Sequence, residues 1–248
     1  MRKVTYILKS FPVLSQTFVI DQINNLIANG YDVRIVSLTQ EKIDEKLQSS
    51  IAKFNLLERT EFINAGRSKL GKMMRLSLVT AYSFLNLIRA KSVISLAFYL
   101  LKANDYKNAI NTLRLFHFLS CETQLPDEYR EGVLVAHFGQ FGVITQSMID
   151  TGVIGGKLLT VFHGYEMSEY EQIKIWKTKY VGLCKGNNRL LPISDFWKKR
   201  LIEWGASAEH ISVLHMGVDT QSIPFKPKPL QNPINILTVA RATEKKGL

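Results

Sequence analysis

The chain has 248 residues, of which 46% are hydrophobic and only seven are proline. This composition is typical of a globular protein with a substantial core, and it excludes collagen-like, disordered and disulfide-scaffold proteins. The 32 Lys and Arg residues outnumber the 21 Asp and Glu residues, and the resulting net charge of +11 favours an anionic partner.

The first forty residues predict a strand, a helix and a second strand. Residues 4–8 form a short apolar run, and Pro12 cannot continue a central strand because it lacks the N–H that a ladder needs. Apolar residues recur at helical spacing from Gln16 until Gly30, which supplies a stop. Residues 33–38 then regain β-branched character. This βαβ opening predicts a parallel α/β sheet.

Residues 41–119 contain no convincing strand and predict a helical insertion. Two stretches within it, 75–88 and 92–101, are apolar enough to be partly buried helices. Arg89 and Lys91 interrupt the apolar character between them, which leaves no run of the ~20 residues that a membrane-spanning helix requires.

Alternating strands and helices return after Pro126. Because ligands bind at the carboxyl ends of strands in open α/β sheets, the loops that follow these strands are the places to look for chemistry. The expected strands are 132–137, 157–163, 190–193 and 211–216, and the expected helices begin or lie at 143–148, 168–180 and 195–204.

A proline-rich stretch marks an expected domain boundary. Residues 223–233 hold four of the seven prolines and predict a semi-rigid linker after a Rossmann-like domain at 1–222. Residues 234–240 predict a buried strand that opens a second domain at 234–248. With no sheet of its own to join, this segment is expected to be disordered or loosely docked, to be prone to edge pairing, and to show little protection from hydrogen exchange.

The loop after the first strand holds three candidate binding residues, Ser15, Gln16 and Thr17. Hydroxyls and backbone N–H groups at a helix N-terminus favour an anion, although Ser15 as a simple helix cap explains the pattern equally well. The loop lacks the glycine-rich dinucleotide fingerprint, which disfavours a nicotinamide-dependent enzyme.

His137 and His163 lie at two expected strand ends, each close to a glycine. A lone histidine is more often structural, but two at equivalent ends of one sheet would face the same crevice. Glu166 could bind a hydroxyl or cap a helix. Arg241 and Lys246 could bind a phosphate, and the alternative is that they belong to an ordinary basic surface loop.

The two cysteines, Cys121 and Cys184, have neither CxxC spacing nor a histidine cluster beside them. The sequence therefore predicts no disulfide framework and no metal site, and a cytoplasmic location.

Charge is concentrated in blocks. Residues 66–114 carry +8 and residues 174–200 carry +7, and the acidic segment 115–173 between them carries −6. An anionic membrane surface, a nucleic acid and a phosphorylated small molecule are all compatible with this pattern, and so are solvated helix faces. No nucleic-acid motif or aromatic stacking platform accompanies the charge, which disfavours nucleic acid.

Short motifs follow one another across nearly the whole chain, and their order resembles a known family. The similarity is to the retaining glycosyltransferases of GT-B fold, group 1 type or glycosyltransferase family 4, especially bacterial exopolysaccharide enzymes of the colanic acid kind. The motifs are Phe11-Pro12-x-x-Ser15-x-Thr17-Phe18, His137-Phe138-Gly139, Phe162-His163-Gly164-Tyr165-Glu166, Ile193-Ser194 with Trp204-Gly205, Ile211-x-Val213-x-x-Met216-Gly217-Val218-Asp219, and Val239-x-Arg241-x-x-x-Lys245-Lys246-Gly247.

This resemblance implies a two-domain enzyme that moves a hexosyl group from a nucleotide sugar to a polysaccharide or lipid-linked saccharide, with no metal or other cofactor. The N-terminal domain is expected to bind the acceptor and the C-terminal domain the donor. By position, the resemblance assigns His163 to catalysis, Arg241 and Lys246 to the donor diphosphate, and Ser15, Gln16, Thr17, His137, Gly164 and Glu166 to the acceptor.

The sequence departs from the family pattern at two places. Gln16 stands where related sequences often carry Glu, and the acidic Glu-x7-Glu segment of the donor domain has no counterpart before Leu248. We therefore interpret the chain as an N-terminal fragment, inactive alone, with a non-catalytic acceptor- or partner-binding module as the alternative. The basic block 66–114 fits docking at the inner face of the cell membrane.

Overall fold

The computed structural model describes residues 2–63, 77, 90–123, 125–217, 220, 225–227, 233 and 235–240. The chain divides into two units, Met1–Met216 and Gly217–Leu248. The sheet, the helices and the candidate site all belong to the first unit.

A six-stranded sheet with the order β3-β2-β1-β4-β5-β6 forms the centre of the first unit, and every pairing in it is parallel. This is the strand order of a Rossmann-like sheet, and it confirms the predicted α/β class. The strands are β1 (Lys3–Phe11), β2 (Asp32–Gln40), β3 (Thr60–Phe62), β4 (Val133–His137), β5 (Lys157–Phe162) and β6 (Arg189–Pro192).

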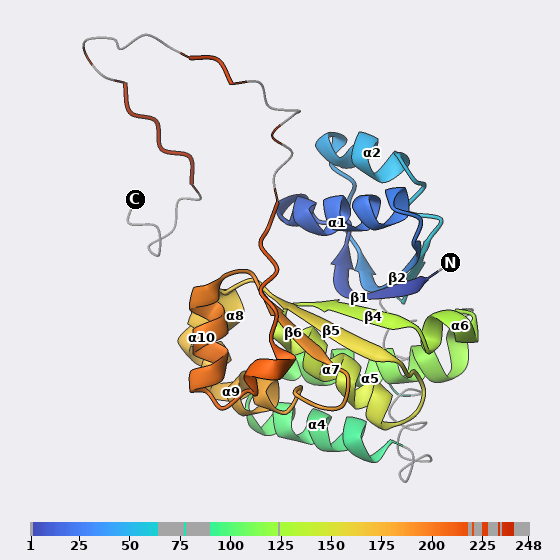
Figure 1. Cartoon of the computed structure of the whole chain (residues 1–248). Coiled ribbons are helices and arrows are strands. Elements are labelled where there is room, and N and C mark those ends of the chain that lie inside the picture. Colours follow the sequence, from blue (N-terminus) through green and yellow to red (C-terminus); the bar gives the residue numbers. More distant parts are fainter. Residues whose placement is uncertain are drawn as a thin grey trace. The chain divides into compact units, whose positions relative to one another are not determined.

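Helices cover both faces of the sheet, as Figure 1 shows. On one face α1 and α2 pack against the sheet, and α4, α5, α7 and α9 pack against the other. The helices are α1 (Thr17–Ala28), α2 (Glu45–Ala52), α4 (Lys91–Lys102), α5 (Tyr106–His117), α6 (Asp127–Arg130), α7 (Gly139–Asp150), α8 (Tyr165–Ser168), α9 (Tyr170–Val181) and α10 (Asp195–Glu203).

The two cores follow from the alternation of side chains along the central strands. In β1, Val4 and Tyr6 belong to the core beneath α1, whereas Ile7 belongs to the core beneath α7. Strands buried on both faces have to be apolar at nearly every position. This is why residues 4–8 of β1 are apolar except for Thr5.

Helix α7 approaches the sheet closely because of two glycines. A Cβ atom on Gly139 would lie 2.4 Å from the ring of Phe162, and one on Gly142 would lie 2.4 Å from the side chain of Thr160. Any larger residue at either position would push the helix away from β5. The turn that carries His137 into α7 is therefore held tightly against the sheet.

The expected strands 4–8, 33–38, 132–137, 157–163 and 190–193 are confirmed, with small shifts of their ends. Helix α7 begins at Gly139, four residues before the expected start, because the glycines of this turn are helical.

Two sequence-based expectations differ from the structure in the first unit. The insertion 41–119, expected to contain no strand, provides the short edge strand β3, whose three residues are only partly buried. Residues 211–216, expected to be a strand, make one bridge to β6 and continue beside it through the Ser212 and Leu214 N–H groups, without becoming a regular strand. β3 lies at a sheet edge, where an apolar run is not required, and residues 211–216 contact the sheet only along β6.

The expected strand at 234–240 does not form. Residues 235–240 have no regular secondary structure, and the side chains of Ile236, Leu237 and Val239 are 86% to 91% exposed. The structure has the unit boundary at residue 216, and the boundaries at 222 and 233 stay predictions. The expected helix at 75–88 falls outside the described residues except for residue 77.

None of the helices that the structure describes has both the length and the apolar character needed to span a membrane.

Candidate functional site

The candidate site lies where the strand order of the sheet reverses. The chain runs outward from β1 to β3 on one side and from β4 to β6 on the other, so the reversal falls between β1 and β4 (Figure 1). Ligands of open α/β sheets bind outside the carboxyl ends of the strands at such a point. His137 ends β4, and His163 follows the neighbouring strand β5.

The structure brings the two predicted histidines into direct contact. Nδ1 of His137 lies 2.9 Å from Nε2 of His163, and Nε2 of His137 lies 2.9 Å from Oε1 of Gln22 on α1. The His137 side chain is only 3% exposed, whereas His163 is partly buried. Three elements of the fold, α1, β4 and the loop after β5, are thus joined by side-chain hydrogen bonds.

Aromatic rings surround the two histidines. Phe18 and Phe138 lie with their ring centroids 4.6 and 4.7 Å from that of His163, and Tyr6 stacks on His137 at 5.8 Å. Burial, together with the repulsion that a protonated His137 would feel from a protonated His163, lowers the pKa of His137 to about 3, and burial lowers the pKa of His163 to about 4. Both rings are therefore neutral near pH 7.

The side chain of Glu166 links the turn that follows His137 to the turn that begins at His163. It is fully buried, and its Oε1 accepts hydrogen bonds from the backbone N–H groups of Gly139 at 3.3 Å and His163 at 3.0 Å. Oε2 has no hydrogen-bonding partner in the part of the chain that the structure describes. Burial raises the pKa of this carboxyl, and the backbone hydrogen bonds oppose the shift. Glu166 therefore caps the N-terminus of α7, whose first residue is Gly139, and fixes the turn that leads into its own helix α8.

Gly164 allows the turn after His163 to pass close to α10. Its φ of +91° is in the left-handed region, and a Cβ atom there would lie 2.6 Å from Nε1 of Trp197. Only glycine fits this position without strain. The backbone of His163 is therefore held on one side by Glu166 and on the other by the close contact with α10.

The predicted loop residues lie at the start of α1. Ser15 and Gln16 belong to a 3₁₀ turn at Leu14–Gln16, and Thr17 is the first residue of the helix. Ser15 and Thr17 are exposed. The interpretation of Ser15 as a helix cap is wrong, because Gln16 holds the cap position of α1 and no side chain there makes a capping hydrogen bond.

Helix α1 links this loop to the histidines, since the next residue, Phe18, packs on both rings. Sequence reasoning missed Gln22, which no motif marks. Arg241 and Lys246 fall outside the described residues. Among the residues that are described, no group of three or more His, Cys, Asp or Glu side chains could hold a metal ion.

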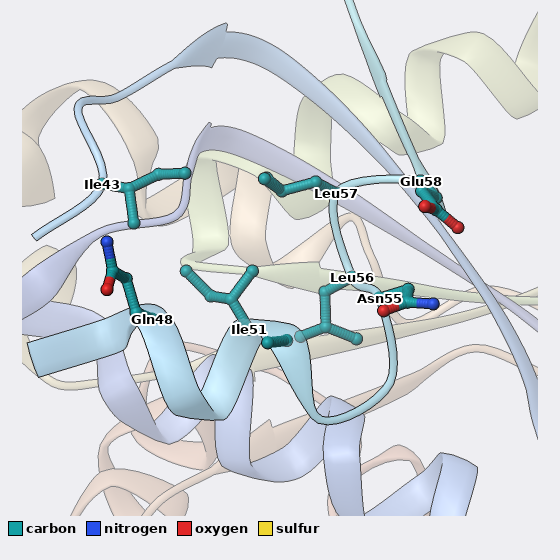
Figure 2. Close-up of a pocket in the computed structure, with 8 residues that line it drawn as sticks. Ile43, Gln48, Ile51, Asn55, Leu56, Leu57 and Glu58 are labelled. Carbon is teal, nitrogen blue, oxygen red and sulfur yellow. The ribbon is translucent and has the colours of Figure 1, made fainter. Parts of the chain in front are cut away.

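A cavity of about 390 Å³ lies away from the strand ends that carry the histidines. Figure 2 shows Ile43, Ile51 and Leu57 directed into the same space between α2 and the segment that follows it. Glu58 is the one titratable residue in its lining. This cavity has the character of an apolar recess rather than of a catalytic centre.

No family model matches the chain. The chain is similar to a protein of Escherichia coli (strain K12) named as the colanic acid biosynthesis glycosyltransferase WcaL, with 33% identity over 249 aligned residues that cover 99% of this chain and 58% of that protein. The protein of the same name from Salmonella typhimurium is 32% identical over 99% of the chain and 58% of its own length.

A third relative is named as the amylovoran biosynthesis glycosyltransferase AmsK of Erwinia amylovora. It is 30% identical over 99% of this chain and 58% of its own length. The chain thus spans a little over half the length of the curated relatives that it matches. All three relatives are named as glycosyltransferases.

Proposed function

We propose that the chain belongs to a retaining glycosyltransferase of exopolysaccharide biosynthesis with GT-B architecture, glycosyltransferase family 4. It transfers a hexosyl group from a nucleotide sugar to a polysaccharide or lipid-linked saccharide. The observation that carries this proposal is the 30% to 33% identity, over 99% of the chain, to three proteins named as glycosyltransferases of colanic acid or amylovoran biosynthesis. In this proposal the first unit binds the acceptor.

The arrangement of the site supports this assignment. His163 stands beside the point of strand-order reversal, where the fold favours ligands, and the exposed Ser15 and Thr17 begin the neighbouring helix. A histidine that is neutral near pH 7 binds a sugar hydroxyl by a hydrogen bond and does not compete for the negative diphosphate. His163 is accordingly the proposed catalytic residue, in contact with the transferred sugar.

The leaving diphosphate calls for cations, which Arg241 and Lys246 supply in this proposal. Cleavage of the sugar–phosphate bond develops negative charge on the leaving group, and fixed cations stabilise that charge without a metal. Retention then follows from attack of the acceptor on the same face as the departing phosphate.

The test joins this chain to the part of the E. coli relative that lies beyond the match. The purified chimera is incubated with ¹⁴C-labelled UDP-glucose, UDP-galactose, GDP-mannose or GDP-fucose and a lipid-linked saccharide extract. We expect transfer of label from one donor, with retained anomeric configuration in the product by NMR. His163→Ala should lower transfer by about 10²-fold or more, and Lys46→Ala, at an exposed position on α2, should not. A folded chimera that transfers no label from any donor argues against the proposal.

A second candidate function is a non-catalytic module that binds an acceptor or a partner. Its support is that the paired histidines and the exposed hydroxyls all belong to the first unit, which folds around its own two cores. Titration calorimetry of the 248-residue chain separates the two. Binding of a nucleotide sugar as tight as that of the intact E. coli relative would exclude the module.

Docking at an anionic membrane through 66–114 remains a proposal, and part of that block is described. On α4, Phe98 and Leu101 are 51% and 40% exposed, and Tyr106 at the start of α5 is 55% exposed. Co-sedimentation with phosphatidylcholine vesicles that contain phosphatidylglycerol, and not with pure phosphatidylcholine, is the expected result; equal behaviour with both would contradict it. The exposed basic side chains on these two helices include Lys91, Lys102 and Lys107.

A further inference from the structure

A chain of hydrogen bonds leads from α1 to the proposed catalytic histidine. Gln22 bonds Nε2 of His137, and Nδ1 of His137 bonds Nε2 of His163, both at 2.9 Å. Both ring nitrogens of His137 are therefore engaged by side chains. Because His137 is only 3% exposed, water has no access through which to replace either partner.

The chemistry of these groups decides which atom donates and which accepts in each hydrogen bond. Oε1 of Gln22 can only accept a hydrogen bond, so Nε2 of His137 carries the proton. A neutral imidazole has a single N–H, and Nδ1 of His137 must then accept from Nε2–H of His163. Nδ1 of His163 is left with its lone pair, and it has no hydrogen-bonding partner among the residues that the structure describes.

The surroundings prevent His163 from escaping this arrangement. Phe18 and Phe138 pack on its ring at 4.6 and 4.7 Å, which hinders a rotation that would exchange the two nitrogens. Its backbone N–H is fixed by Glu166 at 3.0 Å. The ring and the backbone of His163 are thus both held in place, and only the position of the proton on its ring remains to be decided.

We propose that Gln22 and His137 are positioning residues that hold His163 in its Nε2–H tautomer, so that Nδ1 presents a lone pair to a substrate hydroxyl. The identity of that hydroxyl as a saccharide hydroxyl rests on the proposed function. The tautomer itself does not, because it follows from contacts within the first unit. Hydrogen bonds of this kind set the tautomer of histidines in many sites where one nitrogen must face a ligand.

If the Gln22 amide had the opposite orientation, the donor and the acceptor of each of these hydrogen bonds would be exchanged. Its N–H would donate to His137, Nδ1–H of His137 would donate to His163, and His163 would present Nδ1–H instead of a lone pair. The site would then donate to a substrate oxygen rather than accept a hydroxyl proton. The two arrangements differ in which nitrogen of His163 is protonated, and this can be measured.

The test is long-range ¹H–¹⁵N NMR of the histidine rings in the 248-residue chain, near pH 7, with signals assigned by single substitutions of the histidines. For His163 we expect a pyridine-type shift at Nδ1 and a pyrrole-type shift at Nε2. Gln22→Met removes the acceptor at nearly constant size, so both His163 shifts should move toward the average of the two types. Gln48→Met, at an exposed position on α2, is the matched control.

Two results would overturn the proposal: a pyrrole-type Nδ1 of His163 in the wild-type chain, or His163 shifts that stay unchanged in a folded Gln22→Met variant. Circular dichroism establishes that each variant is folded. Because the measurement needs neither donor nor acceptor, it stands apart from the transfer assay. An inactive chimera with the expected tautomer would refute the proposed function alone. An active chimera with the opposite tautomer would refute only the positioning role of Gln22 and His137.

Discussion

Replacing His137 by asparagine is expected to reduce the loss of stability that this protein undergoes in mild acid. Burial lowers the pKa of His137 to about 3 and that of His163 to about 4, from an ordinary value of 6.5. A base whose pKa is lowered on folding stabilises the folded state fully above its unfolded pKa. That contribution is lost as the pH falls from 6.5 toward the folded value, because the unfolded chain takes up the proton first.

The size of the effect follows from the two shifts. One pKa unit corresponds to about 1.36 kcal/mol, and pH 5 lies about 1.5 units below the unfolded pKa, so each histidine costs about 2 kcal/mol of unfolding free energy at pH 5. The pair together costs about 4 kcal/mol, against the ~5 to 15 kcal/mol total that is usual for a folded domain. The wild-type protein should therefore be markedly less stable at pH 5 than at pH 7.

Urea unfolding followed by circular dichroism at pH 7 and pH 5 measures this loss. His137→Asn removes one of the two titrating groups, so its loss between the two pH values should be about 2 kcal/mol smaller than that of the wild type. His215→Asn, at an exposed position, is the control and should follow the wild type. Glu166 contributes equally to all three proteins and cancels in the comparison. If His137→Asn loses as much stability as the wild type, the histidine pair is not buried and neutral as argued.

Three further substitutions test other contacts of the first unit by urea unfolding. Gly164→Ala should lower the unfolding free energy by about 2 kcal/mol or more, because it combines a φ of +91° with a Cβ only 2.6 Å from the indole of Trp197. The control Gly152→Ala, at a φ of +72° with open space around it, should cost about 1 kcal/mol from backbone strain alone. Equal costs in the two variants would refute the clash with Trp197. Glu166→Gln keeps an oxygen for the two backbone N–H groups and removes a carboxyl whose raised pKa makes its contribution to stability fall as the pH rises, so the variant should gain more stability than the wild type between pH 5 and pH 7; an equal gain in both proteins would contradict the raised pKa. Asp32→Asn should destabilise the protein at pH 7 but not in strong acid, because hydrogen bonds from a tyrosine and a lysine hold the pKa of this carboxyl low; a cost independent of pH would contradict that ion-pair role.

Local sequence was sufficient wherever an element is buried on both sides. The apolar run in β1 predicts a central strand, and the structure pairs β1 with neighbours on both edges. Edge elements gave weaker signals. Thr60–Phe62 is too short and too polar to stand out, and 211–216 reads as a strand although it runs along β6 with only occasional ladder bonds.

The candidate site could be predicted only in part for a similar reason. His137 and His163 each stand at a strand end with a glycine within two residues, so topology alone indicates that they share one edge of the sheet. Their direct contact depends on the register of β4 and β5, which pairs His137 with Val161. From the sequence, Glu166 could be a ligand or a helix cap, and only the packing shows that it is buried and bonds the first N–H of α7.

The sequence by itself determined a parallel α/β sheet with histidines at its carboxyl edge, because apolar periodicity and strand ends are local properties. Tertiary structure alone decided which partner each histidine has. Gln22 lies 115 residues before His137, and a single glutamine on an otherwise amphipathic helix carries no pattern that marks it. A tautomer is fixed by the atoms that meet in space, so it could appear only once α1, β4 and the loop after β5 were packed together.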